Sequence, residues 1–186
     1  MHQNFDWLKS FYPHGFSLVF ARQLEPGEIL ARLGCPPEAH RFMTVEDADD
    51  HAAEQSDERE LFQAGTAGEW SFAVQPWGAR ILNDDAAVAR VSQGTEIVVL
   101  VNTSTMPWFA HAIDGVEITS FDPSVPHIRY GTEPDRLLEP MQVSGILPAG
   151  SGSSPFFAAM EMAGREFGLV LDEEIFEDAE LLTGTA

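Results

Sequence analysis

The segment from Glu69 to Asp122 constrains the fold more than any other part of the chain, because it has the pattern of consecutive β-strands. Large apolar side chains alternate with small or polar ones over residues 70–75, and residues 97–101 form an unbroken apolar run. Two further apolar segments, 108–113 and 116–121, flank the pair Asp114-Gly115. An Asp-Gly pair in this setting is the strongest local signal for a two-residue hairpin turn. We therefore expect an antiparallel sheet built around this hairpin.

Signals elsewhere complete an α+β pattern. Residues 16–22 alternate like a strand, and a helix is expected from Pro26 to a stop at Gly34, because proline is favoured in the first helical turn and glycine after the last. Closing helices are expected over residues 155–167 and 172–182. The whole pattern favours one α+β domain over residues 1–186, with a mainly antiparallel sheet, short helices and a helical C-terminal part.

The two-residue turn also predicts which hairpin side chains share a face of the sheet. In that register His111 lies opposite Ile118 on the more apolar face, where a histidine is more often a hydrogen-bonded core residue than a ligand or a base. Trp108 lies opposite Phe121 on the other face. This aromatic pair is expected either to be covered by the closing helices, which is the more common arrangement, or to be exposed as a binding patch.

The charge balance is strongly acidic and unevenly distributed. Ten Lys and Arg residues stand against 30 Asp and Glu, for a formal net charge of −20. The segments 44–63 and 161–186 each carry eight acids and one arginine. Such a field repels nucleic acid and anionic membranes and attracts a basic protein partner, although acidic surface often serves solubility alone. Residues 44–60 lack an apolar stripe and are expected to form an exposed acidic loop or a frayed helix.

Localisation signals point to the cytoplasm by default. No apolar run approaches the roughly 20 residues that a membrane-spanning helix needs. The N-terminal residues lack the basic start and apolar core of a secretory signal. The single Cys35 cannot form an internal disulfide, so nothing indicates an oxidising compartment.

Motifs that would define a reaction or a cofactor are missing from the sequence. There is no nucleophile elbow, no phosphate-binding loop and no metal-ligand set of recognised spacing. His51 and Glu54, with Asp47 and Glu58 one turn to either side, can share a helix face, but so acidic a run produces this spacing by chance. Cys35 follows a helix end, where the dipole raises a thiol pKa. We therefore assign no catalytic residue, no metal and no cofactor, and favour a non-enzymatic role.

The segment after the hairpin combines aromatic residues with two of the few arginines. Arg129 or Arg136 can pair with Asp122 or Asp135 to hold this loop closed, or can receive an anionic ligand. In so acidic a chain the internal ion pair is the favoured role. Together with the aromatic pair, this segment supplies the candidate binding residues: Trp108, Phe121, Asp122, Arg129 and Arg136.

Several short motifs along the chain together carry a family resemblance. They are the strand and helix over residues 16–34, the strand Gly68-Glu69-Trp70-Ser71-Phe72-Ala73-Val74, Ser92 and Gly94 before Thr95-Glu96-Ile97-Val98, the Asp114-Gly115 hairpin, Ser120-Phe121-Asp122-Pro123, Arg129 and Gly131, and Pro134-Asp135-Arg136-Leu137. In these motifs the chain resembles the uncharacterised DUF6461 family of actinobacterial proteins. The resemblance covers about residues 16–170 and implies little chemistry. The acidic segment 44–58 fits the pattern least well.

Three functions are compared on this basis. The first is a non-catalytic acidic protein-binding domain, of the antitoxin or immunity type, that masks a basic partner and uses the face of Trp108 and Phe121 as its apolar anchor. The alternative is a small-molecule-binding protein or enzyme whose pocket lies between the sheet and the C-terminal helices and uses His111, Arg129 or Asp122. A DNA-mimic role requires the acids to form an ordered double row. The charge distribution and the missing reaction motifs favour the first.

Overall fold

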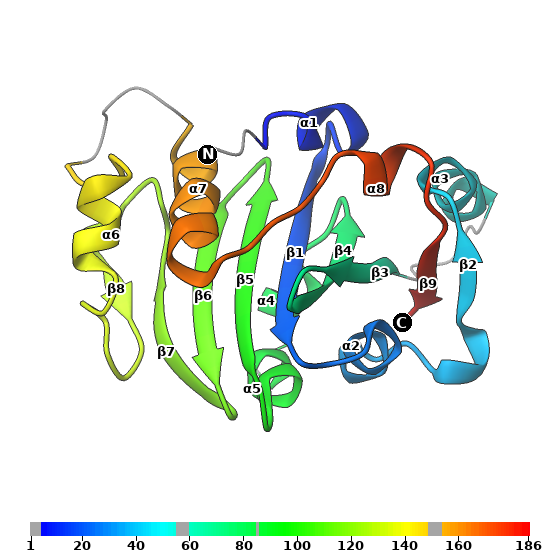
Figure 1. Cartoon of the computed structure of the whole chain (residues 1–186), viewed down its shortest axis with the longest axis horizontal. Helices are drawn as coiled ribbons and strands as arrows, with labels where there is room; N and C mark the ends of the chain where they lie inside the picture. Colours follow the sequence, from blue (N-terminus) through cyan, green and yellow to red (C-terminus); the bar gives the residue numbers. More distant parts are fainter. Residues whose placement is uncertain (1–4, 55–59, 85, 149–153) are drawn as a thin grey trace.

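The computed structural model describes residues 5–54, 60–84, 86–148 and 154–186. Within these residues nine strands form one sheet in the order β2-β9-β3-β4-β1-β5-β6-β7-β8, and every neighbouring pair is antiparallel (Figure 1). The strands are β1 (Gly15–Arg22), β2 (Arg41–Met43), β3 (Leu61–Ala67), β4 (Trp70–Pro76), β5 (Glu96–Thr103), β6 (Pro107–Ile113), β7 (Val116–Phe121), β8 (Arg129–Tyr130) and β9 (Leu181–Thr185). The expected α+β fold with an antiparallel sheet is confirmed.

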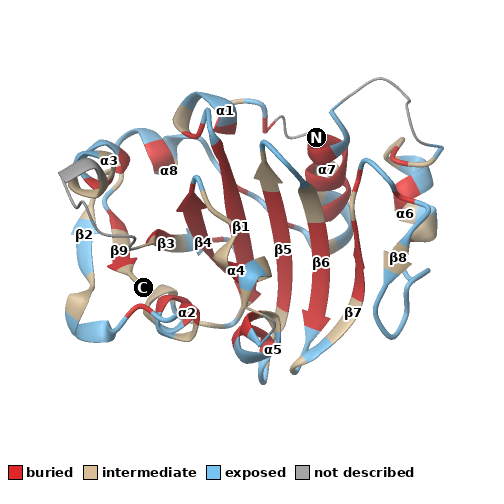
Figure 2. Ribbon diagram, turned by 180° about the vertical axis from the view of Figure 1, so that it is seen from behind, coloured by how far each residue is buried: buried red, intermediate tan, exposed pale blue. Residues whose placement is uncertain are grey.

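Helices cover both faces of this sheet (Figures 1 and 2). In the described ranges they are α1 (Leu8–Phe11), α2 (Pro26–Leu33), α3 (Val45–Glu54), α4 (Arg80–Asn83), α5 (Ala87–Ser92), α6 (Leu138–Val143), α7 (Pro155–Phe167) and α8 (Glu174–Glu177), with a short 3-10 turn at Pro37–Ala39. A phenylalanine-rich core, which includes Phe16, Phe72 and Phe156, fills the space between the sheet and α1, α7 and α8. A second core lies between the sheet and α2, α4 and α5.

The two cores explain the unbroken apolar run in β5. Successive side chains of a strand point to opposite faces of a sheet, so a strand that is covered on both faces needs apolar residues at every position. Val98 and Leu100 enter the phenylalanine-rich core. Ile97, Val99 and Val101, which point to the other face, enter the second core.

The hairpin turn forms where the sequence predicts it. Asp114 and Gly115 have φ angles of +47° and +81°, the left-handed pair that a two-residue turn of this type requires, and Ile113 pairs with Val116. The helix over Pro26–Leu33 also forms as expected, and Gly34 ends it with a φ of +103°.

The predicted register of the hairpin is wrong beyond its first two pairs. The register shifts between the pairs Ala112–Glu117 and His111–Thr119, which leaves Ile118 of β7 as the extra residue of a β-bulge. As a result Phe121 faces Phe109. Because a bulge inserts one residue into one strand, it exchanges the faces of all side chains beyond it. Trp108 and Phe121 therefore lie on opposite faces of the sheet instead of forming a pair.

The C-terminal segment also differs from the expectation of one helix over residues 172–182. Helix α8 covers only Glu174–Glu177, and the chain ends in strand β9 between β2 and β3. There β9 supplies hydrogen-bond partners to the edge of β3, and the pairing extends to Glu60 and Ala186. The obligatory pairing of strand backbone outweighs the helical pattern of the side chains.

The acidic segment 44–60, expected as an exposed loop or a frayed helix, contains the helix α3. Thr44 caps this helix, since its Oγ1 accepts a hydrogen bond from the backbone N–H of Asp47 at 3.1 Å. Val45 and Ala48 are buried, so α3 contacts the core on one side and presents its acids on the other. Residues 55–59 lie outside the described residues.

Candidate functional site

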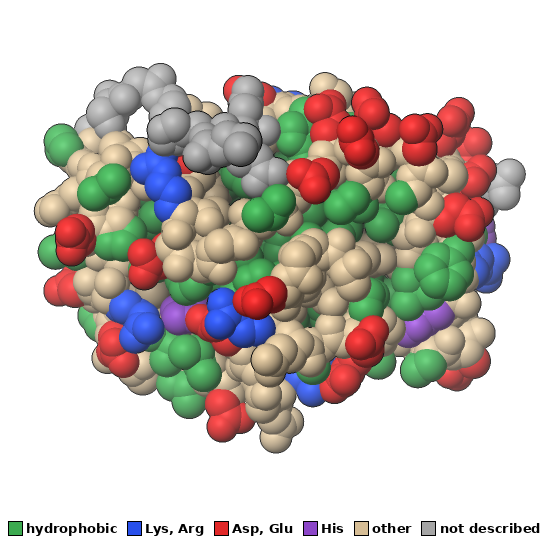
Figure 3. Space-filling view, in the orientation of Figure 1, with side chains coloured by type: hydrophobic (Ala, Val, Ile, Leu, Met, Phe, Trp, Pro, Cys, Tyr) green, Lys and Arg blue, Asp and Glu red, His purple; other side chains and the backbone are tan. Residues whose placement is uncertain are grey.

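Two acidic segments that are far apart in the sequence come together at one end of the molecule. A groove of about 420 Å³ lies between α1, α3 and α8 and is lined by Ser10, Phe11, Val45, Glu46, Asp49, Asp50, Phe176 and Glu177. We call Glu46, Asp49, Asp50, Glu173, Glu174 and Glu177 the acidic surface. Figure 3 shows acidic side chains gathered over α8 and α3 at the upper right of the molecule. None of the six forms an ion pair within the part of the chain that the structure describes.

Asp49 is the member of the acidic surface that also contacts the buried Tyr12 electrostatically. Its pKa is raised, first because the side chain is partly buried and second because Asp50 lies beside it. The phenol of Tyr12 is buried and its pKa is raised by burial and by the nearby Asp49. In both groups burial has the largest effect, and a neighbouring carboxylate acts in the same direction.

A second, apolar groove begins on the other side of α8. Its volume is about 570 Å³, and its lining consists of Glu25, Pro26, Gly27, Phe42, Ala64, Gly65, Thr66, Ile175, Ala179, Glu180, Leu181 and Leu182. Phe42 is 66% exposed and lies among other apolar side chains of this lining, such as Ile175 and Leu182. Glu25 and Glu180 are exposed and form no ion pair with any described residue. The groove is thus an apolar trough with carboxylates in its wall, and α8 joins it to the acidic surface.

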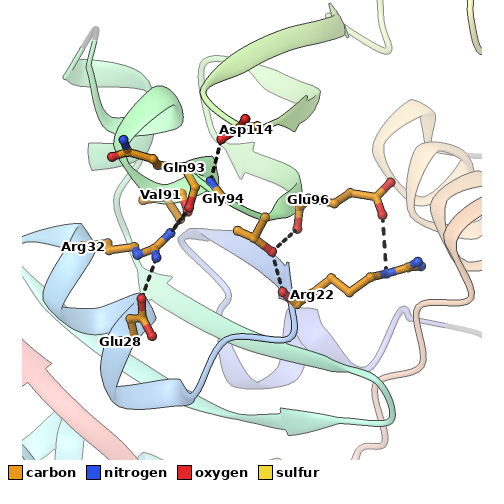
Figure 4. Close-up of polar contacts among 9 residues, drawn as sticks. Arg22, Glu28, Arg32, Val91, Gln93, Gly94, Glu96 and Asp114 are labelled. Atoms are coloured by element: carbon orange, nitrogen blue, oxygen red, sulfur yellow. Dashed lines mark hydrogen bonds and ion pairs between the residues drawn. The ribbon is translucent and has the colours of Figure 1, made fainter.

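A row of polar side chains crosses the opposite end of the phenylalanine-rich face. Arg22 reaches Glu96, with 3.4 Å between its Nε and the carboxylate Oε2 (Figure 4), and its guanidinium carbon lies 4.7 Å from the centre of the Trp70 ring. The other carboxylate oxygen of Glu96 is 3.0 Å from His111 Nε2. Figure 4 also shows the adjacent turn, in which Asp114 accepts a hydrogen bond from the backbone N–H of Gly94 at 2.8 Å.

This row holds the C-terminal end of α7 on the sheet. The His111 ring packs against Phe167 with 4.7 Å between ring centres, and Trp70 Nε1 donates a hydrogen bond to the Phe167 carbonyl at 3.2 Å. Burial lowers the pKa of His111, an effect that outweighs the nearby Glu96, so the imidazole is neutral at pH 7. The fully buried His111 is the hydrogen-bonded core residue that its place in the sequence indicates.

The aromatic members of the candidate binding set are separated by the structure. Phe121 is fully buried and stacks on Phe109 with 5.0 Å between ring centres, so it has no surface to offer a partner. Trp108 is half-buried on the other face and stacks on Tyr130, whose side chain is exposed. This patch lies at the end of the sheet opposite to α3 and β2 (Figure 1), so the acidic surface does not rim it.

The polar members of that set form local contacts. Arg129 donates two hydrogen bonds to Asp135, at 3.0 and 2.6 Å, which is one of the ion pairs expected for it. Asp122 instead accepts a hydrogen bond from the backbone N–H of Ser124, and Arg136 pairs with Glu133. Arg136 also lines a groove of about 430 Å³ between α6 and α7, which the other four candidates do not line.

Groups that support nucleophilic or metal chemistry are not assembled in the described part of the chain. Burial raises the pKa of the Cys35 thiol to about 12, so it stays protonated and unreactive near neutral pH. Three or more His, Cys, Asp or Glu side chains placed to hold a metal ion are not found among the described residues. Of the four residues that can share a helix face in the sequence, Asp47, His51, Glu54 and Glu58, the last lies outside the described residues.

Sequence reasoning found the acids of this end of the molecule but missed the apolar groove beside them. Phe42 belongs to a three-residue strand, and Thr66 lies on a strand edge that is left open only because β9 begins at Leu181. The only local signal is the hydrophobic pair Phe42-Met43 between the polar residues Arg41 and Thr44. That signal is too short to predict a groove.

Fold and site together define an α+β protein with helices on both faces of an antiparallel sheet and an acidic, grooved end. The model of a family of unknown function, DUF6461, matches residues 2–186, and the chain therefore belongs to that family. The match includes the acidic segment that resembles the family pattern least. Comparisons with curated proteins and with solved structures gave no match. In the described residues, no helix combines the length and the apolar character needed to cross a membrane.

Proposed function

We propose that this protein is a non-catalytic binding domain, of the antitoxin or immunity type, that engages a basic protein partner through its acidic surface. The observation that carries the proposal is the meeting of α3 and α8, which places acids from two segments more than 100 residues apart beside one groove, without ion pairs among the described residues. Elsewhere on the molecule, acids such as Asp135, Glu133 and Glu161 are paired with arginines. Other acids without ion pairs are exposed elsewhere, but the acidic surface is where six of them gather over two neighbouring helices.

Electrostatics gives such a surface two advantages in recognising a basic partner. A single-sign patch accelerates encounter with an oppositely charged protein and disfavours acidic competitors. Arginine and lysine side chains of the partner would also supply counter-charge to carboxylates that form no ion pair among the described residues. The apolar residues in the groove, Phe11 and Phe176 among them, would give the contact a desolvated centre.

The experiment compares two triple variants that remove the same charge from different places. One neutralises the acidic surface (Glu46→Gln, Asp50→Asn, Glu177→Gln). The matched control neutralises exposed acids elsewhere (Glu69→Gln, Glu139→Gln, Glu166→Gln). Each protein is immobilised, exposed to native lysate at low and high salt, and the bound proteins are quantified by mass spectrometry.

The expected result is one basic partner captured near stoichiometry at low salt by the wild-type and control proteins. Capture by the acidic-surface variant should fall about tenfold or more, because several charge contacts are lost together. The proposal is overturned if no stoichiometric partner appears at either ionic strength, or if the two variants capture it equally.

A further inference from the structure

We propose that the apolar groove receives an extended segment of the basic partner, which adds as a short β-strand to the free edge of β3 at Thr66. The inference rests on the proposed function and names the form of the partner that the site recognises. Its starting point is a mismatch in strand length: β9 pairs with β3 only over Leu61–Ala64, whereas β3 continues to Ala67.

The direction of the Thr66 backbone follows from the ladder. Glu60 and Ala186 exchange backbone hydrogen bonds, at 3.4 and 2.9 Å, so even-numbered positions of this segment present their N–H and C=O to the side of β9. Ala67 pairs with Trp70 across a two-residue turn, which directs the odd-numbered positions to β4. Thr66 is exposed and lies beyond the start of β9. Its N–H and C=O have no backbone partner in the described residues.

The groove exists because the chain leaves the sheet at this point. Ala179 and Glu180 connect α8 to the start of β9, and both line the groove together with Thr66. Gly65 also lines the groove and lets the Phe72 ring pack closely against β3, since a Cβ there would lie 2.9 Å from that ring. A strand laid along Thr66 would therefore have backbone partners on one side and an apolar trough for a side chain below it, the two elements of strand-addition recognition.

Charge and exposed apolar surface define the chemistry of that strand. Glu25 and Glu180 lie in the groove wall without ion pairs, and Phe42 is 66% exposed beside them. In an extended segment alternate side chains point to opposite sides. A segment that alternates an aliphatic residue with Lys or Arg would place the aliphatic side chain in the trough and the cations near the carboxylates. The occupant is thus a basic, alternating, extended segment of the partner.

The probe is a synthetic peptide of about seven residues that alternates lysine and valine, with blocked ends. The reference peptide has glutamate in place of each lysine. Binding is followed by amide chemical shifts of the labelled protein and by hydrogen exchange of the Thr66 amide. We expect shifts at Gly65, Thr66 and Phe42, slower exchange at Thr66 and no binding of the glutamate peptide.

Two variants examine the two parts of the site. Thr66→Pro removes the outward N–H, together with the exposed threonine side chain, and fixes φ, a change that an edge position tolerates. Phe42→Ser removes the exposed ring. Each should weaken binding of the lysine peptide about tenfold. Val143→Ser is the control, because Val143 is similarly exposed at 70% but lies on α6 at the other end of the sheet (Figure 1). If Thr66→Pro alters the protein's own spectrum, Phe42→Ser and the pair Glu25→Gln, Glu180→Gln decide the result.

Several outcomes overturn the inference. They are shifts confined to α3 and α8, equal binding by Thr66→Pro and wild type, absence of peptide binding, or self-association that shows the edge to pair with a second copy of the chain. These outcomes are distinguishable from a failure of the proposed function. If the captured partner still requires the acidic surface but ignores Thr66→Pro and Phe42→Ser, the proposed function stands without the strand addition.

Discussion

At the scale of single residues, His111 illustrates how neighbours decide the chemistry of a side chain. Its Nε2 donates to Glu96, while its Nδ1 is buried without a hydrogen-bond partner in the described structure. Glu96 and Glu133 favour the charged imidazolium, and Arg136 opposes it, but burial has the largest effect and lowers the pKa. A proton on Nδ1 would have no acceptor. The native structure therefore holds this histidine in its neutral form.

The lowered pKa of His111 predicts a loss of stability in mild acid. Between its folded-state pKa and the unfolded value near 6.5, the unfolded chain binds the proton more readily, so the contribution is full above about pH 6.5 and declines as the pH falls. Between about pH 7.5 and pH 5.5 the free energy of unfolding should drop by up to about 1.4 kcal/mol more in the wild type than in His111→Gln. Urea denaturation at both pH values measures this, and equal drops in the two proteins would contradict it.

At the scale of secondary-structure elements, the β-bulge in β7 has the largest consequence. By exchanging the faces of the residues beyond it, the bulge places Phe121 in the phenylalanine-rich core and leaves Trp108 half-buried on the opposite side. The same shift puts the polar Thr119 opposite His111, where its hydroxyl donates to the Pro134 carbonyl at 3.1 Å. One inserted residue thus decides which aromatic side chain supports the fold and which stays near solvent.

This arrangement predicts unequal effects of two truncations. Phe121→Ala should lower the free energy of unfolding by about 3–5 kcal/mol, because it leaves a cavity in a packed core. Trp108→Ala should cost about 1–2 kcal/mol, the loss of one partly exposed stacking contact with Tyr130. Chemical denaturation of both variants gives the comparison. Similar losses would agree with the pairing of Trp108 and Phe121 and contradict the bulged register.

For the molecule as a whole, arginine–carboxylate pairs are found around β8, α6 and α7, whereas six acids without ion pairs among the described residues gather around α3 and α8. Around β8, α6 and α7 the arginines Arg129, Arg136 and Arg165 each contact a carboxylate. Around α3 and α8 the acids face one another without arginine or lysine partners among the described residues. Mutual repulsion of this kind opposes folding, and salt screens it.

Added salt should accordingly stabilise the protein. Raising NaCl from about 10 mM to about 0.5 M shortens the Debye length from about 30 Å to about 4 Å and should raise the melting temperature by a few degrees. The acidic-surface variant should gain clearly less than the wild type, and the matched control should gain as much as the wild type. Thermal melts followed by circular dichroism provide the readout. An equal salt response in all three proteins would show that the acidic surface is not the source.

Local features can be predicted from the amino-acid sequence alone: the turn at Asp114-Gly115, the helix between Pro26 and Gly34, and the helix over Pro155–Phe167. Each depends on residues adjacent in the chain, whose backbone preferences and spacing are readable directly. Three features follow from packing in three dimensions instead: the bulged register, the place of β9 beside β3, and the meeting of the two acidic segments. These depend on partners that in the last two cases are more than 100 residues apart, because strand pairing and charge proximity are set by neighbours in space.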